Sequence, residues 1–328
     1  MKIRNTLAGV LVSTTMVMAA PIQAQAIDIT VFHNDKDNFG DTMVWWIDEI
    51  KTRTEGRVEI TPVYNSALAK VTETLDAVRD GVVPMGVALA SFMSGVVPAL
   101  GYPEMIGGLP SDPTDAGEAL LAIWPTVETL LEPQGVVPLW GQTAFGTGVI
   151  CREVHLNGPA DWKDLTVRAA GRWQSKQVEA MGATPMPVDT AEIYIALQNG
   201  TIDCALMNPT SANALRLYEV APFYTDLKLP SNIVTYIINQ QAWSDISEAD
   251  RAVIEEVSSD ATKRGVQHIM DEVGNEFEAM AKAGAKIYAA SPEERQAFIE
   301  ASRPIFDQIG AASGEGGEAI RAVLSKYW

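Results

Sequence analysis

The segment from Asp164 to Pro209 constrains the fold more than any other part of the chain, because strand-like and helix-like runs alternate in it. Residues 165–167 are an apolar and β-branched run of the kind that forms a buried parallel strand, and residues 202–207 are a second one. Helices are expected between them, over 174–181 and over 189–200, each closed by a glycine. This rhythm predicts an α/β fold with a largely parallel sheet at this place.

Two polar residues directly follow these strands. Arg168 stands at the carboxyl end of the first strand and Asn208 at that of the second. In open α/β sheets ligands bind beyond the carboxyl ends of the strands, so both side chains are expected to face one crevice. A planar guanidinium suits a carboxylate. The alternatives are that Arg168 ties down a loop by pairing with a nearby acid and that Asn208 only starts a turn.

A similar order of elements occurs twice along the chain. Strand, helix, glycine and strand are expected over 58–89 and again over 184–207, which is a weak pseudo-repeat and suggests two lobes that are built alike. Extended runs over 139–149 and 229–239 are expected to cross between the lobes, and two such crossings make a hinge. Residues 250–283 predict a long helix or a broken pair of helices.

The amino terminus has the features of a cleaved export signal. Lys2 and Arg4 precede an apolar stretch from Leu7 to Ala20, and Ala24-Gln25-Ala26 has the form of a signal-peptidase site. We therefore expect residues 1–26 to be a signal peptide and the mature protein to be periplasmic. The apolar stretch is too short for a permanent membrane span.

The charge balance excludes several classes of partner. The chain has a formal net charge of −18, and the loss of Lys2 and Arg4 with the signal peptide makes the mature protein more acidic still. Such a field repels nucleic acid and anionic lipid. It also repels anionic ligands unless a local cation captures them, which gives Arg168 added weight.

Catalytic and metal-binding signatures are not found in the sequence. The three histidines are scattered, and there is no HExxH, CxxC or GxSxG pattern. We therefore expect neither an enzyme nor a metal or cofactor. Cys151 and Cys204, the only cysteines, fall near the sheet of the second lobe. In an oxidising compartment they form a disulfide or remain two buried thiols, and the sequence does not decide between these states.

Several motifs together resemble one protein family. They are LTVRAAG at 165–171, the Glu192 to Gly200 run with the following Ile202-Asp203, and Asn208-Pro209, supported upstream by 56–58 and 75–81. They are similar to the DctP-like solute-binding proteins of tripartite ATP-independent periplasmic (TRAP) transporters, and the resemblance covers nearly all of the mature chain.

The resemblance implies a two-lobed periplasmic binding protein fold. Each lobe would be a mixed sheet flanked by helices, with a ligand cleft between the lobes and a long helix bracing both. By this reasoning lobe I consists of residues 27–146 with about 236–275. Lobe II consists of residues 147–235 with about 276–328.

The resemblance also implies which residues bind the ligand. Arg168 matches the arginine that holds the substrate carboxylate in the family, and Asn208 matches an asparagine that contacts the substrate. We expect further contacts, each with an alternative role in packing or capping, from Asn34, Trp173, Thr190 and Phe145. A second arginine of the sialate-binding relatives is missing here, which argues against sialic acid. One cation with aromatic neighbours instead suggests a monocarboxylate with an apolar or aromatic part.

The function that follows from the resemblance is the capture of a small organic acid. The loaded protein, expected to be a monomer, would deliver it to TRAP membrane permease subunits for uptake driven by an ion gradient. Two alternatives remain. The chain serves an ATP-driven transporter or a sensor, or it is an exported two-lobed enzyme, against which the missing acid/base and metal signatures count.

Overall fold

The computed structural model describes residues 25–33, 38–110 and 112–328. Within these residues the strands are β1 (Gln25–Thr30), β2 (Val58–Val63), β3 (Met85–Leu89), β4 (Val136–Cys151), β5 (Thr166–Arg168), β6 (Thr184–Met186), β7 (Cys204–Met207), β8 (Phe223–Asn239) and β9 (Lys286–Ala289). They form one mixed sheet in the order β2-β1-β3-β8-β4-β7-β5-β6, and β9 pairs with β8. The predicted strands over 58–63 and 85–89 are confirmed.

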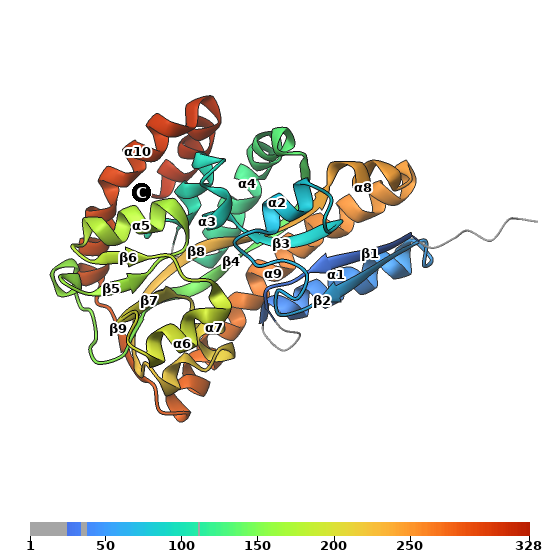
Figure 1. The fold of residues 1–328 in the computed structure, drawn as a ribbon. Coiled ribbons are helices and arrows are strands. Elements are labelled where there is room, and N and C mark those ends of the chain that lie inside the picture. The colour runs from blue at the N-terminus through green and yellow to red at the C-terminus, as the bar shows by residue number, and fades with distance from the viewer. Residues whose placement is uncertain (1–24, 34–37, 111) are drawn as a thin grey trace, which may run out of the picture.

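Helices cover this sheet on both faces (Figure 1). The α-helices are α1 (Asn38–Arg53), α2 (Thr74–Arg79), α3 (Ala90–Met93), α4 (Pro113–Leu131), α5 (Gly171–Ala180), α6 (Ile193–Gln198), α7 (Pro209–Ala214), α8 (Gln240–Asp245), α9 (Glu248–Lys282) and α10 (Pro292–Leu324). The 3₁₀ turns are η1 (Pro98–Glu104), η2 (Glu132–Gln134), η3 (Pro159–Trp162), η4 (Thr190–Glu192), η5 (Leu217–Glu219) and η6 (Ser325–Tyr327).

Two long antiparallel strands, β4 and β8, run through the middle of the molecule (Figure 1). On one side of them lie β1, β2 and α1, and on the other lie β5, β6 and β7 with their helices. The β4–β8 register shifts at several places between Thr143 and Gly148. A β-bulge bends a strand locally and increases its twist, so this stretch turns the sheet from one side of the molecule to the other. Both predicted crossing strands are present, and both are longer than predicted.

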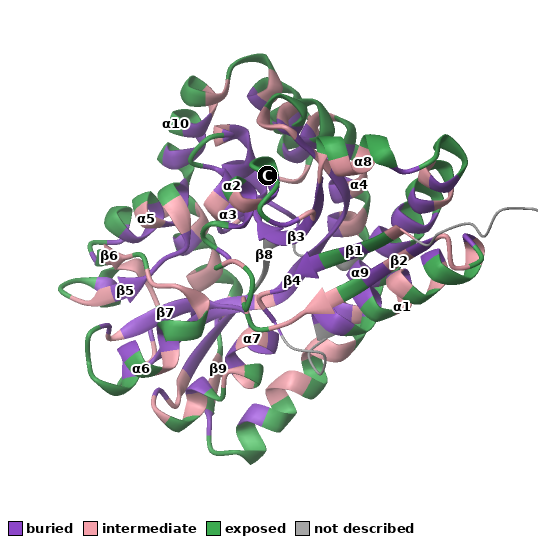
Figure 2. Ribbon diagram, turned by 45° about the vertical axis from the view of Figure 1, so that its right-hand side comes forward, coloured by how far each residue is buried: buried purple, intermediate pink, exposed green. Residues whose placement is uncertain are grey.

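The buried side chains form three clusters, which are distributed over the two sides of the β4–β8 pair. The first lies around β1, β3 and α4, where Trp140 stacks on Tyr236 with 3.8 Å between the ring centroids. The second and third lie around β5 and β7, on either face of that part of the sheet. Figure 2 shows the buried residues along β4 and the exposed ones on the outer turns of α10. The carboxyl-terminal part of α10, with Ile305, Ile309 and Leu324, packs into the first cluster.

The long helix predicted over 250–283 is confirmed as α9. The Ser247 side chain caps its first turn by accepting a hydrogen bond from the Asp250 N–H. Ile254 and Val257 near its start belong to the first cluster, and Met280 near its end belongs to the third. The helix therefore contacts both sides of the molecule, as a brace would.

The structure differs from the expected elements in three places. Helix α7 begins directly after Asn208, where the sequence suggested only the end of a strand, because Pro209 is well suited to the first position of a helix. The short strand β9 was not expected. The glycine-rich run over 313–317, where the sequence predicts a linker before a terminal helix, lies within α10 and kinks it at Gly314, whose φ of 57° lies in the left-handed region.

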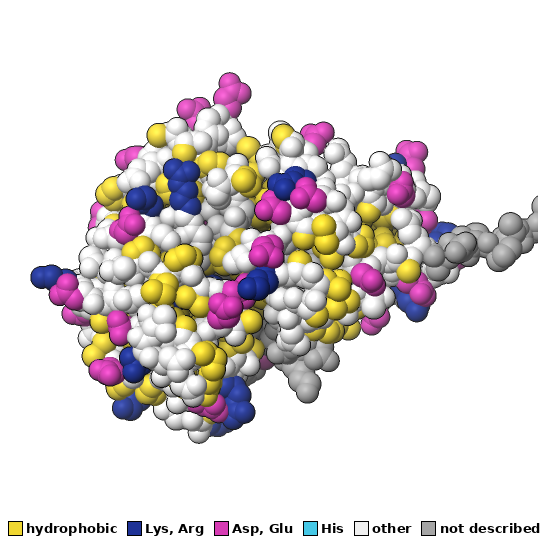
Figure 3. Space-filling view, in the orientation of Figure 1, with side chains coloured by type: hydrophobic (Ala, Val, Ile, Leu, Met, Phe, Trp, Pro, Cys, Tyr) yellow, Lys and Arg dark blue, Asp and Glu magenta, His cyan; other side chains and the backbone are white. Residues whose placement is uncertain are grey.

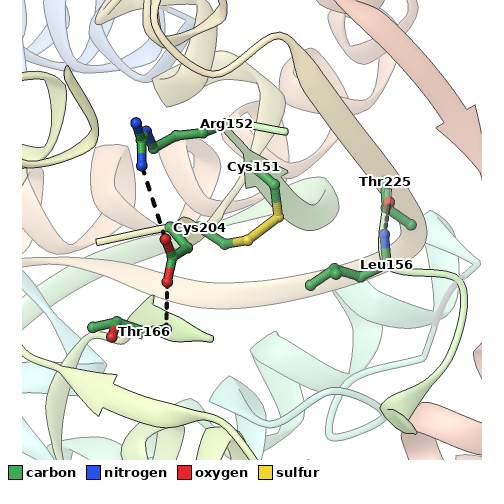
Figure 4. Close-up of a disulfide and its surroundings, with 7 residues drawn as sticks. Cys151, Arg152, Leu156, Thr166, Cys204 and Thr225 are labelled. Atoms are coloured by element: carbon green, nitrogen blue, oxygen red, sulfur yellow. Dashed lines mark hydrogen bonds and ion pairs between the residues drawn. A yellow bond between two sulfur atoms is a disulfide. The ribbon is translucent and has the colours of Figure 1, made fainter. Parts of the chain in front are cut away.

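Cys151 and Cys204 form a disulfide, which settles the alternative that the sequence left open (Figure 4). The two residues face each other on the antiparallel strands β4 and β7. Beside them, Asp203 accepts a hydrogen bond from the Thr166 N–H and pairs with Arg152. The disulfide therefore joins the crossing strand to the strands that carry the candidate site.

On the face seen in Figure 3, basic side chains occur singly or in small groups among acidic ones, as the negative net charge leads one to expect. Among the described residues, no helix combines the length and the apolar character that crossing a bilayer requires.

Candidate functional site

Arg168 is the last residue of β5, and its side chain is buried beneath the neighbouring loops, with 4% of its surface exposed. Parallel pairing places it beside Met186, the last residue of β6, and beside Ala205 of β7. Its Nε donates a hydrogen bond to the Val188 carbonyl at 3.1 Å, and its Nη1 donates to the Leu206 carbonyl at 3.4 Å. These two bonds orient the guanidinium, which has five N–H donors in all.

The charge on Arg168 lacks a full counter-charge among the described residues. Burial lowers the pKa of Arg168 to about 10, while Asp189 and Glu104 act in the opposite direction. The group is thus still a cation at neutral pH. Its hydrogen-bond partners are neutral carbonyls, and neither of the two acids lies close enough to form an ion pair with it. A buried charge without a partner is costly, so this side chain favours the entry of an anion.

Asn208 lies at the same edge of the sheet, at the carboxyl end of β7, with 5% of its surface exposed. Its Oδ1 accepts a hydrogen bond from the Ser211 N–H at 2.8 Å and so caps α7. The sequence suggested a ligand contact or a turn; the structure shows a capping bond, which leaves the amide nitrogen for another partner.

Arg168 and Asn208 line one small cavity with about 30 Å³ of open space. Two of its nine lining residues are ionisable, Arg168 and Glu104. The complete lining is Glu104, Ile106, Thr147, Arg168, Gln174, Gln177, Leu206, Met207 and Asn208. The cavity therefore combines one cation, several amide and hydroxyl groups and an apolar wall.

Seven of the nine lining residues were not predicted from the sequence, and Glu104 is the ionisable one among them. It ends η1, on the other side of the molecule from β5, so the sheet rhythm around Asp164 to Pro209 does not point to it. A signal was nevertheless present, because Glu104 is the only charged residue between Asp80 and Asp112. An isolated charge in a long apolar segment is seldom there for solubility.

A larger groove of about 770 Å³ lies elsewhere, between α4, β4, α8 and α9. Its acidic side chains, Glu128, Glu132 and Glu255, are exposed to solvent, and the tryptophans Trp124 and Trp243 form part of its walls. No Lys or Arg lies among its lining residues. We therefore place the candidate site at Arg168, where a buried charge and converging polar groups meet.

Trp173 serves the contact between the two sides of the molecule. It is buried, its Nε1 donates to the Pro98 carbonyl of η1 at 3.0 Å, and its ring lies against Gly101. The guanidinium of Arg172 stacks on the same ring, 4.5 Å from its centroid. Trp173 is not among the residues that line the cavity.

The other predicted residues fall at different places. Phe145 is buried in the first cluster, and Thr190 lies half-buried in η4, just after the N-cap Asp189. Neither is among the lining residues of the cavity, so their roles in binding stay predictions. Asn34 lies outside the described residues. Among the described residues no aromatic side chain lines the cavity, and the apolar wall consists of Ile106, Leu206 and Met207.

Within residues 25–33, 38–110 and 112–328, no group of three or more His, Cys, Asp or Glu side chains is arranged to hold a metal ion.

Comparison with known proteins gives a consistent result. Residues 30–313 match the sequence model of a family described as bacterial extracellular solute-binding protein, family 7 (DctP). The C4-dicarboxylate-binding periplasmic protein DctP of Rhodobacter capsulatus is 27% identical over 286 residues, which are 82% of this chain and 81% of that protein.

Two solved structures share the fold. DctP7 of Bordetella pertussis, an extracytoplasmic solute receptor binding pyroglutamic acid, superimposes with a TM-score of 0.85 at 22% identity, covering 92% of this chain and 100% of that one. A TRAP periplasmic solute-binding protein of Chromohalobacter salexigens with bound D-glucuronate gives 0.82 at 22% identity, covering 91% and 99%. At such identity these likenesses show the architecture, which is the two-lobed fold expected from the sequence.

Proposed function

The chain belongs to family 7 of the bacterial extracellular solute-binding proteins, the DctP family, and from this premise we propose that it captures a small organic acid whose carboxylate binds Arg168. The single observation that carries the proposal is the buried guanidinium at the carboxyl end of β5, whose charge the described acids balance only in part. A carboxylate would supply the missing counter-charge. Two charge-assisted hydrogen bonds, each worth roughly 1.5–3 kcal/mol, would account for a large part of micromolar binding.

The ligands of the relatives support the chemical class. Pyroglutamic acid, D-glucuronate and C4-dicarboxylates, with which the three relatives above are described, all carry a carboxylate. Their remaining parts differ widely. The carboxylate is therefore the feature that we transfer to this chain, and the rest of the ligand has to follow from its own cavity.

The loaded receptor would deliver the acid to the membrane subunits of a TRAP transporter, and an ion gradient would drive the uptake. A ligand that contacts Arg168 on one side and η1 on the other would hold the two sides together. Only contacts that improve on closure can supply the energy of closure. We propose a monomeric receptor in the periplasm that carries out no chemical step on its ligand.

A thermal-shift screen of ligand-stripped protein against small organic acids tests the proposal. A ligand at one hundred times its dissociation constant stabilises the protein by about 2.7 kcal/mol, which raises the melting temperature by several degrees. We expect at least one carboxylic acid to do so, while its uncharged amide does not. Equal shifts with the acid and its amide would show that the carboxylate is not the recognised group.

The two possible roles of Asn208, capping and ligand contact, can be separated by substitution. Asp at this position keeps the oxygen that accepts from the Ser211 N–H, and it is as good an N-cap as Asn. It also adds a negative charge beside Arg168, which repels a carboxylate. We expect Asn208→Asp to weaken ligand binding at least tenfold in calorimetric titrations, while the melting temperature of the free protein changes little.

Asn208→Ala serves as the matched control, because it removes the cap without adding charge and should cost about 1 kcal/mol of stability. If Asn208→Asp binds the ligand as the unchanged protein does, the ligand lies outside the reach of this residue.

A further inference from the structure

Glu104 lines the same cavity as Arg168, and the charge of Arg168 acts on its carboxyl. It is the last residue of η1, a segment whose residues Leu100, Tyr102 and Met105 belong to the first cluster, whereas β5 belongs to the second. Only 1% of its surface is exposed, and it is one of the nine lining residues. A ligand that binds Arg168 in this cavity is therefore also within reach of an acid from a different part of the fold.

Both carboxyl oxygens of Glu104 lack a hydrogen bond of normal geometry to any described residue. Groups of Ser91 lie close enough to favour the ionised form, as does the charge of Arg168. Burial has the larger effect and raises the pKa of the Glu104 carboxyl well above its usual range. A buried polar group that is left unsatisfied costs roughly 1–3 kcal/mol, and poorly formed hydrogen bonds are often retained at a binding site because the ligand supplies a better partner.

A neutral carboxylic acid presents one donor, its O–H, and one acceptor, its C=O, side by side. The group that fits it best has the complementary pair on adjacent positions, as in the H–N–C=O unit of a lactam or a hydroxyl next to a carbonyl. The charge of the cavity also favours a ligand with a single carboxylate. Arg168 with a neutral Glu104 gives the cavity one positive charge, which a single carboxylate neutralises. A second carboxylate on the ligand would remain unpaired.

We propose that Glu104 is the second recognition residue of this cavity and that the ligand is a small monocarboxylate with an N–H or O–H donor next to an acceptor, such as a lactam or hydroxy acid. This inference rests on the proposed function and names the substrate class of the same site. It replaces the aromatic part that the sequence suggested for the ligand by a polar one. Binding to Glu104 and Arg168 together also ties the two sides of the molecule to each other through the ligand.

Matched pairs of acids test the inference by calorimetric titration. L-Pyroglutamate and cyclopentanecarboxylate share a five-membered ring and a carboxylate, but only the first has the donor and acceptor. L-Lactate and propionate form a second pair, and succinate is the dianion. We expect the unchanged protein to prefer the polar member of at least one pair by tenfold or more and to bind succinate more weakly than that member.

Two substitutions of Glu104 then separate polarity from shape. Glu104→Met has a similar length without donors or acceptors and should reduce the preference to about threefold or less. Glu104→Gln retains one donor and one acceptor and should restore the preference. Among the described charged residues, Arg168 is the one whose charge acts on the pKa of the Glu104 carboxyl. Because burial raises the pKa of the Glu104 carboxyl, affinity should fall with rising pH in the unchanged protein as this carboxyl ionises, and it should stay constant over the same range in Glu104→Gln, which cannot ionise.

Glu128→Gln, in the larger groove, controls for a general effect of removing an acid and should leave every affinity unchanged. The inference is overturned if plain acids bind as tightly as their polar partners, if succinate binds most tightly, or if Glu104→Met keeps the preference. In each of these cases the proposed function still stands, provided that Arg168→Met abolishes binding. If no acid binds in a manner that depends on Arg168, the proposed function fails and the inference fails with it.

Discussion

Replacing Arg168 by Met should weaken binding of the organic acid at least about 100-fold, the largest effect that we expect from a single substitution. Two charge-assisted hydrogen bonds to a carboxylate are lost, and each contributes roughly 1.5–3 kcal/mol. Met fills a similar volume, so the change acts mainly on charge and hydrogen bonding. Calorimetric titration of the free protein with the acid found in the screen measures the effect.

Stability and binding have to be compared in the same variant, because the guanidinium also donates to the Val188 and Leu206 carbonyls. Removal of a buried cation relieves a desolvation cost, whereas the two carbonyls lose their partner, so we expect only a small net change in melting temperature. Arg172→Met is the matched control. This neighbouring arginine is exposed and stacks on Trp173, and its loss should leave the affinity within about twofold. Equal losses in both variants would contradict a specific role of Arg168.

Removal of the disulfide should lower stability by roughly 4 kcal/mol, the second large effect. The bond closes a loop between residues that are 53 positions apart, and the chain-entropy estimate for a loop of this size gives that value. For a protein of this length the loss corresponds to a fall in melting temperature of roughly 5–8 °C. Calorimetry of the Cys151→Ala, Cys204→Ala double variant measures it.

A reducing agent provides the control for this second prediction. It should lower the melting temperature of the unchanged protein toward that of the double variant, and it should leave the double variant itself unaffected. A melting temperature of the unchanged protein that does not respond to complete reduction, verified by counting free thiols, would show that the bond contributes little to stability.

The sequence predicted those site residues whose position follows from the neighbouring strands and helices in the chain. Arg168 and Asn208 could be placed together because each follows a strand and the carboxyl ends of parallel strands meet at one edge. Likewise, apolar spacing predicted α9, and extended runs predicted the crossing strands. The family resemblance added the two-lobed arrangement, which comparison with solved structures supports.

What the sequence could not show depends on contacts between distant segments. Glu104 lies at the cavity because η1 packs against α5. The isolated charge at position 104 indicates an unusual residue, but the surrounding sequence does not predict a contact with α5. The same contact accounts for the hydrogen bond from Trp173 to the Pro98 carbonyl, and the predicted role of Trp173 toward a ligand stays a prediction. The disulfide required the strand register, which places Cys151 opposite Cys204.

The most direct test of the account is a crystal structure of the protein with the small molecule that it retains on purification, or with the acid that stabilises it most. We expect this structure to show a carboxylate within hydrogen-bond distance of the Arg168 guanidinium and a donor and acceptor pair facing Glu104. A ligand bound in the groove beside Trp124 and Trp243, or one that presents an uncharged group to Arg168, would contradict it.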